Sequence, residues 1–322
     1  MLETLTTSEG RVEIAVDPDG VNTVEVFPND VSQFISVRSC RTTYSSGLIA
    51  KILAVQGIAW VCDEISRDED PNHASKYLLN DLAAYFSPAD LAGKRILDFG
   101  CGAGASTAIL ARTFPQAQFT GVELRAELLE IAKGRASHYG LTNTSFIVSP
   151  HGSSVPPNLD EYDLVILSAV VEHLLPDERS VILPLLWKRV RSGGCLFLDQ
   201  TPYRYFPLEL HTTMLPFINY LPDSLAFAYA KAFSKRIDPR ETWESLLRRG
   251  IRGATEREIG SALAGSRLLK CKRGDRIDLW YDNTNPQRFA TVKSVAKHIL
   301  KLLYRSTGVC MIPDLALAFQ KQ

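Results

Sequence analysis

The feature that most constrains the fold is a regular alternation of strand-like and helix-like segments between residues 95 and 200. Runs that are almost entirely apolar, such as RILDF (95–99) and YDLVILS (162–168), are separated by amphipathic stretches such as RAELLEIAKGRASHYG (125–140). Strands that are apolar throughout are typical of a sheet with helices on both faces. The alternation therefore predicts an α/β fold with a doubly wound, mostly parallel sheet, which binds ligands at the carboxyl ends of its strands.

The segments on either side of this core follow other patterns. Residues 11–40 predict two or three strands joined by turns, and residues 47–86 predict helices. After Gln200 the alternation stops, and prolines among aromatic residues indicate an insertion or cap. Beyond the cap we expect a helix at 255–265, a strand-like segment at 266–282, a helix at 288–305 and a final strand at 313–319.

Composition excludes several classes of protein. The 322 residues are 45% hydrophobic, and no run approaches the roughly 18 apolar residues of a membrane span. The N-terminus lacks the basic-then-apolar order of a signal peptide, so a cytoplasmic location is expected. The six cysteines form no C-x-x-C pair, which predicts reduced thiols rather than a zinc knuckle or a disulfide framework.

Charge is balanced overall but unevenly placed. From Lys231 onward there are 19 Lys and Arg against 9 Asp and Glu, and before it 17 against 27. The basic region attracts an anionic substrate or RNA, or it docks against the acidic region. The helix expected at 288–305 is basic on one side, and we expect its apolar face to join the core; peripheral contact with a membrane surface is the alternative.

A glycine-rich turn follows the first strand of the core, with Gly100, Gly102 and Gly104 after Asp98. Gly100, Gly102 and Ala105 also satisfy the G-x-G-x-x-G/A dinucleotide pattern, so a nicotinamide-dependent oxidoreductase is one hypothesis. The carboxylate of Asp98 argues against it, because two anions repel each other and a pyrophosphate is anionic. An acid at this strand end instead favours a ligand that carries a cation.

A second acid, Glu123, closes the next strand 21 residues beyond Gly102. At this place in the fold a carboxylate accepts hydrogen bonds from both ribose hydroxyls of a nucleoside cofactor. The spacing is the same for a nicotinamide cofactor. Glu123 therefore predicts a ribose site without choosing between the two cofactor classes.

The segments ILDFGCGAG, GVEL, YDLVILSAVVEHL and SGGCLFLDQTP together resemble the class I S-adenosylmethionine-dependent methyltransferases, in particular the small-molecule, type 11-like group with a D-x-G-x-G-x-G loop. The resemblance spans about Leu91 to Pro202 and implies a seven-stranded, Rossmann-like sheet. It implies that S-adenosyl-L-methionine is the cofactor, with the glycine turn around its methionine end and Glu123 at its ribose. The residues implied to bind it are Asp98, Gly100, Cys101, Gly102, Gly104, Glu123, Leu124 and Ser168.

The sequence departs from the family in one loop. After the third strand the family usually carries an acid near the adenine amine, whereas this chain has Pro150, His151 and Ser153. The segment TPYRYFPLELHTTMLPFINYLP (201–222) is similar to one in bacterial methyltransferases of sugar, lipid or secondary-metabolite acceptors. A small-molecule acceptor, methylated at a hydroxyl by in-line displacement, is therefore the expected partner.

The chemistry needs an aligned acceptor and, in some cases, a base. His173 follows the fourth strand and His211 lies in the cap, and both imidazoles titrate near neutrality, so they are the candidate catalytic bases. Their structural alternatives are a helix cap with Glu172 and an ordered loop. Tyr203 and Arg204 are candidates to orient the acceptor, although Arg204 could equally pair with a surface acid. No metal is expected, since the strand ends do not offer an oxygen-rich cage.

The resemblance and the breaks in pattern divide the chain into four predicted parts. These are an N-terminal extension with lid helices (1–88), a cofactor-binding core (89–202), an acceptor cap (203–265) and C-terminal strands and a helix that complete the sheet (266–322). An RNA-directed methyltransferase or binding module is a further alternative, but no RNA-reading pattern supports it. The oligomeric state stays open.

Overall fold

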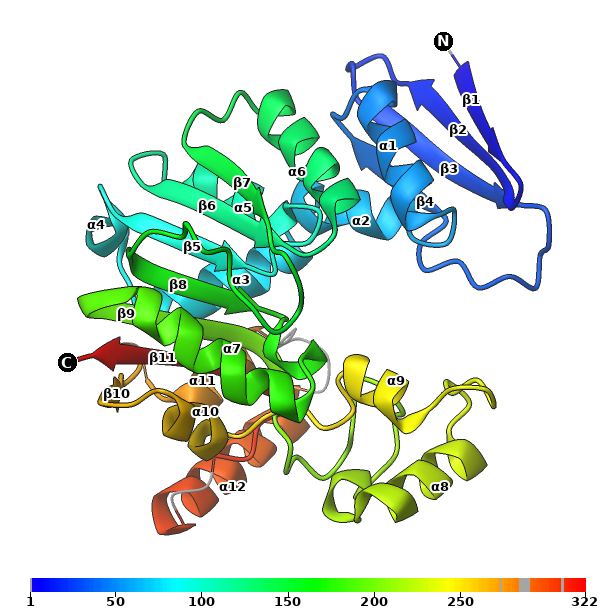
Figure 1. The fold of residues 1–322 in the computed structure, drawn as a ribbon. Helices are drawn as coiled ribbons and strands as arrows, with labels where there is room; N and C mark the ends of the chain where they lie inside the picture. The colour runs from blue at the N-terminus through cyan, green and yellow to red at the C-terminus, as the bar shows by residue number, and fades with distance from the viewer. Residues whose placement is uncertain (1, 273, 284–289, 308–309) are drawn as a thin grey trace.

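A seven-stranded sheet forms the centre of the computed structural model, which describes residues 2–272, 274–283, 290–307 and 310–322 (Figure 1). The strand order is β10-β11-β9-β8-β5-β6-β7; the last five strands are parallel, and β11 pairs antiparallel with both of its neighbours, β10 and β9. The strands are β5 (Arg95–Phe99), β6 (Gln118–Glu123), β7 (Thr144–Val148), β8 (Tyr162–Ser168), β9 (Val190–Pro202), β10 (Ser266–Leu268) and β11 (Asp314–Lys321). The predicted doubly wound, mostly parallel sheet is confirmed.

Helices cover both faces of this sheet. Alternate residues of β5 show why its sequence is apolar throughout: Ile96 packs with α3, α4 and α5 on one face, and Leu97 packs with α7 and α10 on the other. The helices of the first face are α3 (Ala74–Ala83), α4 (Pro88–Leu91), α5 (Ala105–Thr113) and α6 (Ala126–His138), and those of the second are α7 (Pro176–Arg189) and α10 (Glu256–Ala262).

The N-terminal region contains a separate antiparallel sheet as well as helices. Its elements are β1 (Leu2–Thr7), β2 (Gly10–Val16), β3 (Asn22–Pro28), β4 (Ser39–Thr42), α1 (Ser46–Gln56) and α2 (Val61–Glu69). The apolar side chains of this unit pack against Leu128 and Ile131 of α6. The predicted strands are therefore present, but a description of residues 1–88 as a helical lid omits a four-stranded sheet.

The segment after β9 has a small hydrophobic core of its own, which includes Ile218, Ala226 and Leu246. It contains η2 (Ile218–Tyr220), α8 (Asp223–Phe233) and α9 (Trp243–Arg248). The N-terminal sheet and this segment lie beyond the carboxyl ends of the parallel strands, on opposite sides of that edge (Figure 1). A lid or cap role for the two parts remains a prediction, and so do the four domain boundaries.

The strand predicted at 266–282 is wrong for its second half. Only β10 is extended, and Arg276–Asn283 forms helix α11. Asp275 accepts hydrogen bonds from the backbone N–H groups of Ile277 and Asp278, while Asp278 accepts one from the backbone N–H of Asp275. This reciprocal cap satisfies N–H groups at the helix start, and it outweighs the alternating pattern that suggested a strand.

The helix predicted at 288–305 is present as α12 (Ala290–Thr307), although residues 288 and 289 lie outside the described residues. Leu300 and Tyr304 pack against Ile277. Most of the apolar face is exposed, however, so the expectation that it joins the core is wrong. Across the described ranges, each helix is either too short or too polar to cross a lipid bilayer.

Candidate active site

The glycine turn after β5 has a left-handed backbone at each of its three glycines. A Cβ on Gly100 would lie 2.7 Å from Val170 Cγ2, and one on Gly104 would lie 2.5 Å from Ala132 Cβ. These two positions need glycine for packing as well as for conformation. A Cβ on Gly102 would meet no described atom within 4 Å, so this part of the turn faces open space.

Asp98 is buried beneath the turn rather than exposed at its surface. Its Oδ2 accepts hydrogen bonds from Ser106 Oγ (2.7 Å) and Thr107 Oγ1 (2.6 Å), which tie β5 to the start of α5. Burial raises the pKa of Asp98 despite these two donors. The side chain of Cys101 is also buried, against Leu129 of α6, so only its backbone is available to a ligand in the turn.

Glu123 connects the turn to the end of β6. Its Oε2 accepts from the backbone N–H of Gly102 at 3.1 Å, and its Oε1 accepts from the N–H groups of Leu124 and Arg125. A cavity of about 240 Å³ lies beside it. The residues that line this cavity are Phe99, Gly100, Val122, Glu123, Leu124, Ser149, His151, Gly152, Ala169, Val170, His173, Leu174 and Arg248.

Four of the residues singled out from the sequence meet at this cavity: Gly100, Glu123, Leu124 and the candidate base His173. The other predicted cofactor residues, which are not among its described lining, are Asp98, Cys101, Gly102, Gly104 and Ser168. His151 lines the cavity from the loop that lacks the family acid. Sequence reasoning missed Arg248, because it follows His173 by 75 residues and no local pattern connects them.

The ends of β8 and β9 carry unusual backbone conformations. Ala169 (φ 53°) and Gln200 (φ 57°) are left-handed without being glycine, a strain that concentrates at functional sites. Asp199 directly precedes Gln200, and its carbonyl oxygen accepts from the backbone N–H of Ala169. Its side chain is fully buried, and its Oδ1 has no hydrogen-bond partner among the described residues. Burial raises the pKa of Asp199 to about 6, although Gln200 and Ser168 donate hydrogen bonds to it.

The short helix η1 (Val171–His173) follows β8 and presents Glu172 and His173. Glu172 is fully buried, and its Oε2 accepts from Thr201 Oγ1. Its Oε1 has no hydrogen-bond partner among the described residues and lies 3.6 Å from His173 Nε2. Burial raises the pKa of Glu172 to about 8. His173 Nδ1 lies 2.7 Å from the carbonyl oxygen of Arg248, so Nδ1 carries the hydrogen and the lone pair is on Nε2.

The structure brings His211 to the same place, with its ring centroid 5.7 Å from that of His173. Glu209 fixes the loop that carries it, because its carboxylate accepts from the backbone N–H groups of His211, Thr212 and Thr213. Burial lowers the pKa of both imidazoles, which favours their neutral forms. Both candidate bases are therefore adjacent to Glu172.

Three buried acids consequently lie at the carboxyl ends of β5, β8 and β9 or just after them: Asp98, Glu172 and Asp199. The negative charge of Asp98 adds to the raised pKa of Asp199, and that of Asp199 adds to the raised pKa of Glu172. A buried, incompletely paired carboxylate is stabilised by a cationic group and destabilised by an anion. The edge of the sheet thus favours a cationic ligand, as the sequence indicated from Asp98 alone.

Comparison with known proteins gives the family. Residues 96–194, from β5 into β9, match the family model described as a methyltransferase domain. Over residues 96–194 the chain therefore carries a methyltransferase domain, and this match supports the resemblance to the class I S-adenosylmethionine-dependent methyltransferases. The oxidoreductase hypothesis is set aside accordingly.

Two curated proteins are similar to part of this chain. The ubiquinone biosynthesis O-methyltransferase of Vibrio cholerae is 38% identical over 109 residues, which are 34% of this chain and 42% of that protein. The fatty-acid O-methyltransferase of Mycolicibacterium smegmatis is 32% identical over 139 residues, 43% of this chain and 47% of that protein. The chain thus spans less than half the length of these two relatives. Among solved structures, the S-adenosylmethionine-dependent methyltransferase SibL is similar with 13% identity and a TM-score of 0.46, over 85% of this chain and 61% of that chain.

Glu172, His173 and His211 also form the kind of group that can hold a metal ion. One carboxylate oxygen and one nitrogen from each imidazole lie within 4.8 Å of one another. Two imidazoles and a carboxylate suit a transition metal or zinc. The expectation that the protein uses no metal therefore stays a prediction that needs its own test.

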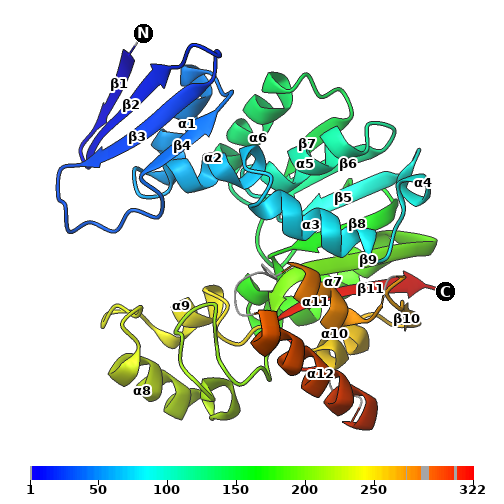
Figure 2. The same cartoon turned by 180° about the vertical axis from the view of Figure 1, so that it is seen from behind.

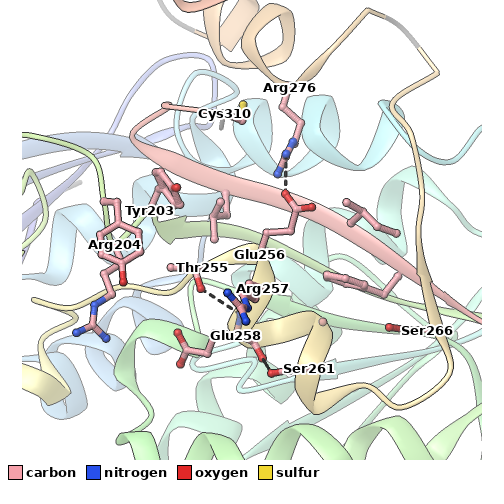
Figure 3. Close-up of a pocket in the computed structure, with 15 residues that line it drawn as sticks. Tyr203, Arg204, Thr255, Glu256, Arg257, Glu258, Ser261, Ser266, Arg276 and Cys310 are labelled. Carbon is pink, nitrogen blue, oxygen red and sulfur yellow. Dashed lines mark hydrogen bonds and ion pairs between the residues drawn. The ribbon is translucent and has the colours of Figure 1, made fainter. Parts of the chain in front are cut away.

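Tyr203 and Arg204 do not line the cavity beside Glu123. They line a larger cleft of about 1230 Å³ beside α10 and β11, which an ion pair of 2.6 Å between Arg276 and Glu256 spans (Figure 3). The guanidinium of Arg204 points away from this pair in Figure 3, and its Nε is buried without a described partner. The structure therefore separates the two predicted acceptor residues from the candidate bases.

A third cavity, of about 340 Å³, lies near the end of β9. Gln200 lines it, next to the buried Asp199, and Arg276 lines both this cavity and the cleft of Tyr203. Its other walls are mainly apolar, and they include Tyr77, Leu210, Leu279, Trp280, Ile312, Pro313 and Ala316. Local sequence patterns did not indicate this cavity, because its lining comes from α3, α11, β9, β11 and loops between them.

Proposed function

We propose that the protein transfers a methyl group from S-adenosylmethionine to a hydroxyl of a small, largely apolar acceptor. The observation that carries the proposal is that Glu172, buried with an unpartnered oxygen, adjoins His173 at the cavity that Glu123 also lines. One end of the site can thus accept ribose hydroxyls, and the other offers a base.

The residues around the turn fit S-adenosylmethionine. Glu123 would accept from the ribose hydroxyls, the open side of Gly102 would admit the methionine end, and the buried carboxylates would favour its positive charge. When bound, the cofactor supplies an electrophilic methyl group. The protein has to align the acceptor oxygen, exclude water and remove one proton.

His173 is the first candidate for that proton. With Nδ1–H donated to the Arg248 carbonyl, the free lone pair is on Nε2, which faces Glu172. Burial lowers the pKa of the imidazole, so it is unprotonated and able to act as a base at neutral pH. His211 lies close enough to take the role or to relay the proton.

The proposed acceptor class is supported by the third cavity, whose lining residue Leu210 directly precedes His211. Its aromatic and aliphatic walls suit an aromatic or aliphatic body, and Gln200 and Asp314 offer hydrogen bonds at its rim. The names of the two curated relatives refer to ubiquinone biosynthesis and to a fatty acid. A phenol or a lipid hydroxyl is therefore favoured over a sugar.

Cofactor binding is tested by calorimetry with S-adenosylmethionine and with NAD on the purified chain. We expect saturable binding of S-adenosylmethionine only, and Glu123→Ala should weaken it about 100-fold through the lost ribose hydrogen bonds. Glu127→Ala is the matched control, because this exposed acid lies four residues later on α6 and pairs with the exposed Arg125. Equal affinity in the two variants would contradict the ribose assignment.

Turnover is tested by following S-adenosylhomocysteine release with panels of phenols, long-chain hydroxy compounds and sugars. We expect product with the first or second panel. The assay is repeated after EDTA treatment: unchanged turnover supports the imidazoles as bases, and a loss restored by one divalent metal would show that Glu172, His173 and His211 hold that metal instead. No release with any panel, despite tight cofactor binding, would overturn the proposed acceptor class.

A further inference from the structure

Helix α12 exposes its apolar face instead of burying it. The exposed apolar residues are Val292 (67% exposed), Val295, Ile299, Leu302 (64% exposed) and Leu303, and we call them the α12 stripe. Their spacing of three and four residues puts them on one side of the helix. No residue in the described ranges covers this side.

The charged side of α12 is the one that faces the protein. Lys297 and Lys301 pair with Asp278 of α11 at 2.8 and 2.6 Å, and Leu300 and Tyr304 pack beside them. A surface helix of a globular protein normally has the reverse orientation, with its apolar side inward. The ion pairs thus hold α12 so that its stripe points outward. Exposure of these apolar side chains to water is unfavourable.

The charge around the stripe indicates what covers it. The helix contains four Lys or Arg and no acid, and Arg305 is exposed near its end. Asp275 and Asp278 offset part of this charge, but the region from Lys231 onward keeps 19 basic against 9 acidic residues. A second copy docked by the same face would bring two cationic helices together, which is unfavourable. An anionic surface complements them.

A second exposed apolar group lies at the same end of the molecule. Figures 1 and 2, which view the molecule from opposite sides, both place α8 and α12 at the end away from the N-terminal sheet. On α8 and just before it, Phe217, Leu225 and Phe233 are exposed by 57% or more. One end of the protein therefore presents apolar side chains from two separate helices.

We propose that α12 binds the surface of an anionic lipid bilayer, with the α12 stripe inserted among the lipid chains and the exposed Arg305 near the headgroups. An amphipathic helix binds in this way through buried apolar area and attraction to anionic lipid. The occupant is the bilayer itself, so the inference does not depend on the proposed methyl transfer.

The test is co-sedimentation of the full chain with vesicles of phosphatidylcholine alone or with phosphatidylglycerol added. We expect binding to the anionic vesicles that weakens as salt is raised, since salt screens the headgroup attraction. The variant Ile299→Glu/Leu302→Glu should bind the anionic vesicles about tenfold more weakly or less, because it places charges in the inserted stripe.

The matched control is Val16→Glu/Val31→Glu, which replaces two exposed valines of the N-terminal region by the same charges. It should bind vesicles as the unmodified chain does. Equal binding to neutral and anionic vesicles, or equal binding by the two variants, would overturn the proposal. So would light scattering that shows a dimer lost in Ile299→Glu/Leu302→Glu, with no vesicle binding by the unmodified chain.

Discussion

Two clusters of buried charged residues flank the glycine turn, and they differ in how completely they are paired. On the α6 side, the Arg135 guanidinium donates to Tyr44 Oη and to the carbonyls of Ala103 and Glu64. It also forms ion pairs with the carboxylates of Glu64 at 2.9 Å and Asp68 at 3.2 Å. On the β8 side, Glu172 and Asp199 each keep one buried oxygen without a described partner.

The difference separates a structural cluster from a functional one. The Arg135 cluster joins α2 and the N-terminal segment to α6 and to the turn, and each of its charges is met by an opposite charge or a donor. A buried group without a partner costs free energy and persists where a ligand uses it. We therefore expect changes in the Arg135 cluster to affect stability and changes in the Glu172 cluster to affect activity.

The largest effect is expected from Arg135→Met. Removing the guanidinium leaves Glu64 and Asp68 buried without their cation, which should lower the free energy of unfolding by about 4 kcal/mol. Chemical denaturation measures it. Lys133→Met on the same helix is the control, because its pair with Glu130 is exposed to water and should contribute little to stability. A loss below about 1 kcal/mol in Arg135→Met would remove the distinction between the clusters.

His173→Gln should have the opposite profile. Glutamine can still donate to the Arg248 carbonyl but cannot take a proton, so turnover should fall about 100-fold, with the free energy of unfolding unchanged within about 0.5 kcal/mol. The pH–rate profile gives a second measurement. Its acidic limb, set by an imidazole whose pKa burial lowers, should disappear in the variant. An unaltered acidic limb would assign the base to His211.

Glu172→Gln should change how the free energy of unfolding depends on pH. Burial raises the pKa of Glu172 from 4.5 to about 8, so the folded state holds a proton that the unfolded state releases. The free energy of unfolding of the unmodified chain should fall as pH rises through this interval. The variant should lack this contribution and be more stable at pH 8 by about 2 kcal/mol, while losing activity. Chemical denaturation at pH 5 and pH 8 measures the free energy of unfolding of the variant and the parent. An equal change of this free energy with pH in the two proteins would refute a buried, protonated Glu172.

The smallest effects come from single hydroxyls. Tyr44→Phe removes a hydroxyl that donates to Asp68 and accepts from Arg135, and Thr201→Val removes one that donates to Glu172. We expect losses in the free energy of unfolding of about 2 and about 1 kcal/mol, respectively, because the first hydroxyl has more partners. Thermal unfolding measures the two side by side. A larger loss for Thr201→Val would mean that the Glu172 cluster also carries the fold.

The sequence predicted the part of the site that lies on consecutive elements. Gly100, Glu123, Leu124 and His173 follow directly from strand ends, and the structure places all four at one cavity. It did not predict the fate of Tyr203 and Arg204, which line a different cleft, because the direction of the chain after β9 depends on its packing with β11 and α10. Nor did it show the partners of Asp98, whose hydroxyl donors lie in the first turn of α5.

Local patterns in the sequence were enough to predict the α/β core, its order of strands and helices and the acid-and-glycine turn, because these depend on local periodicity and on backbone conformations that few residues adopt. The approach of Arg248 and His211 to His173 and the outward apolar side of α12 arise when the chain folds. Such contacts join residues far apart in the chain, so neighbouring residues do not encode them. Which face of an amphipathic helix is covered depends on the ion pairs and packing that its neighbours offer, and no local pattern contains them.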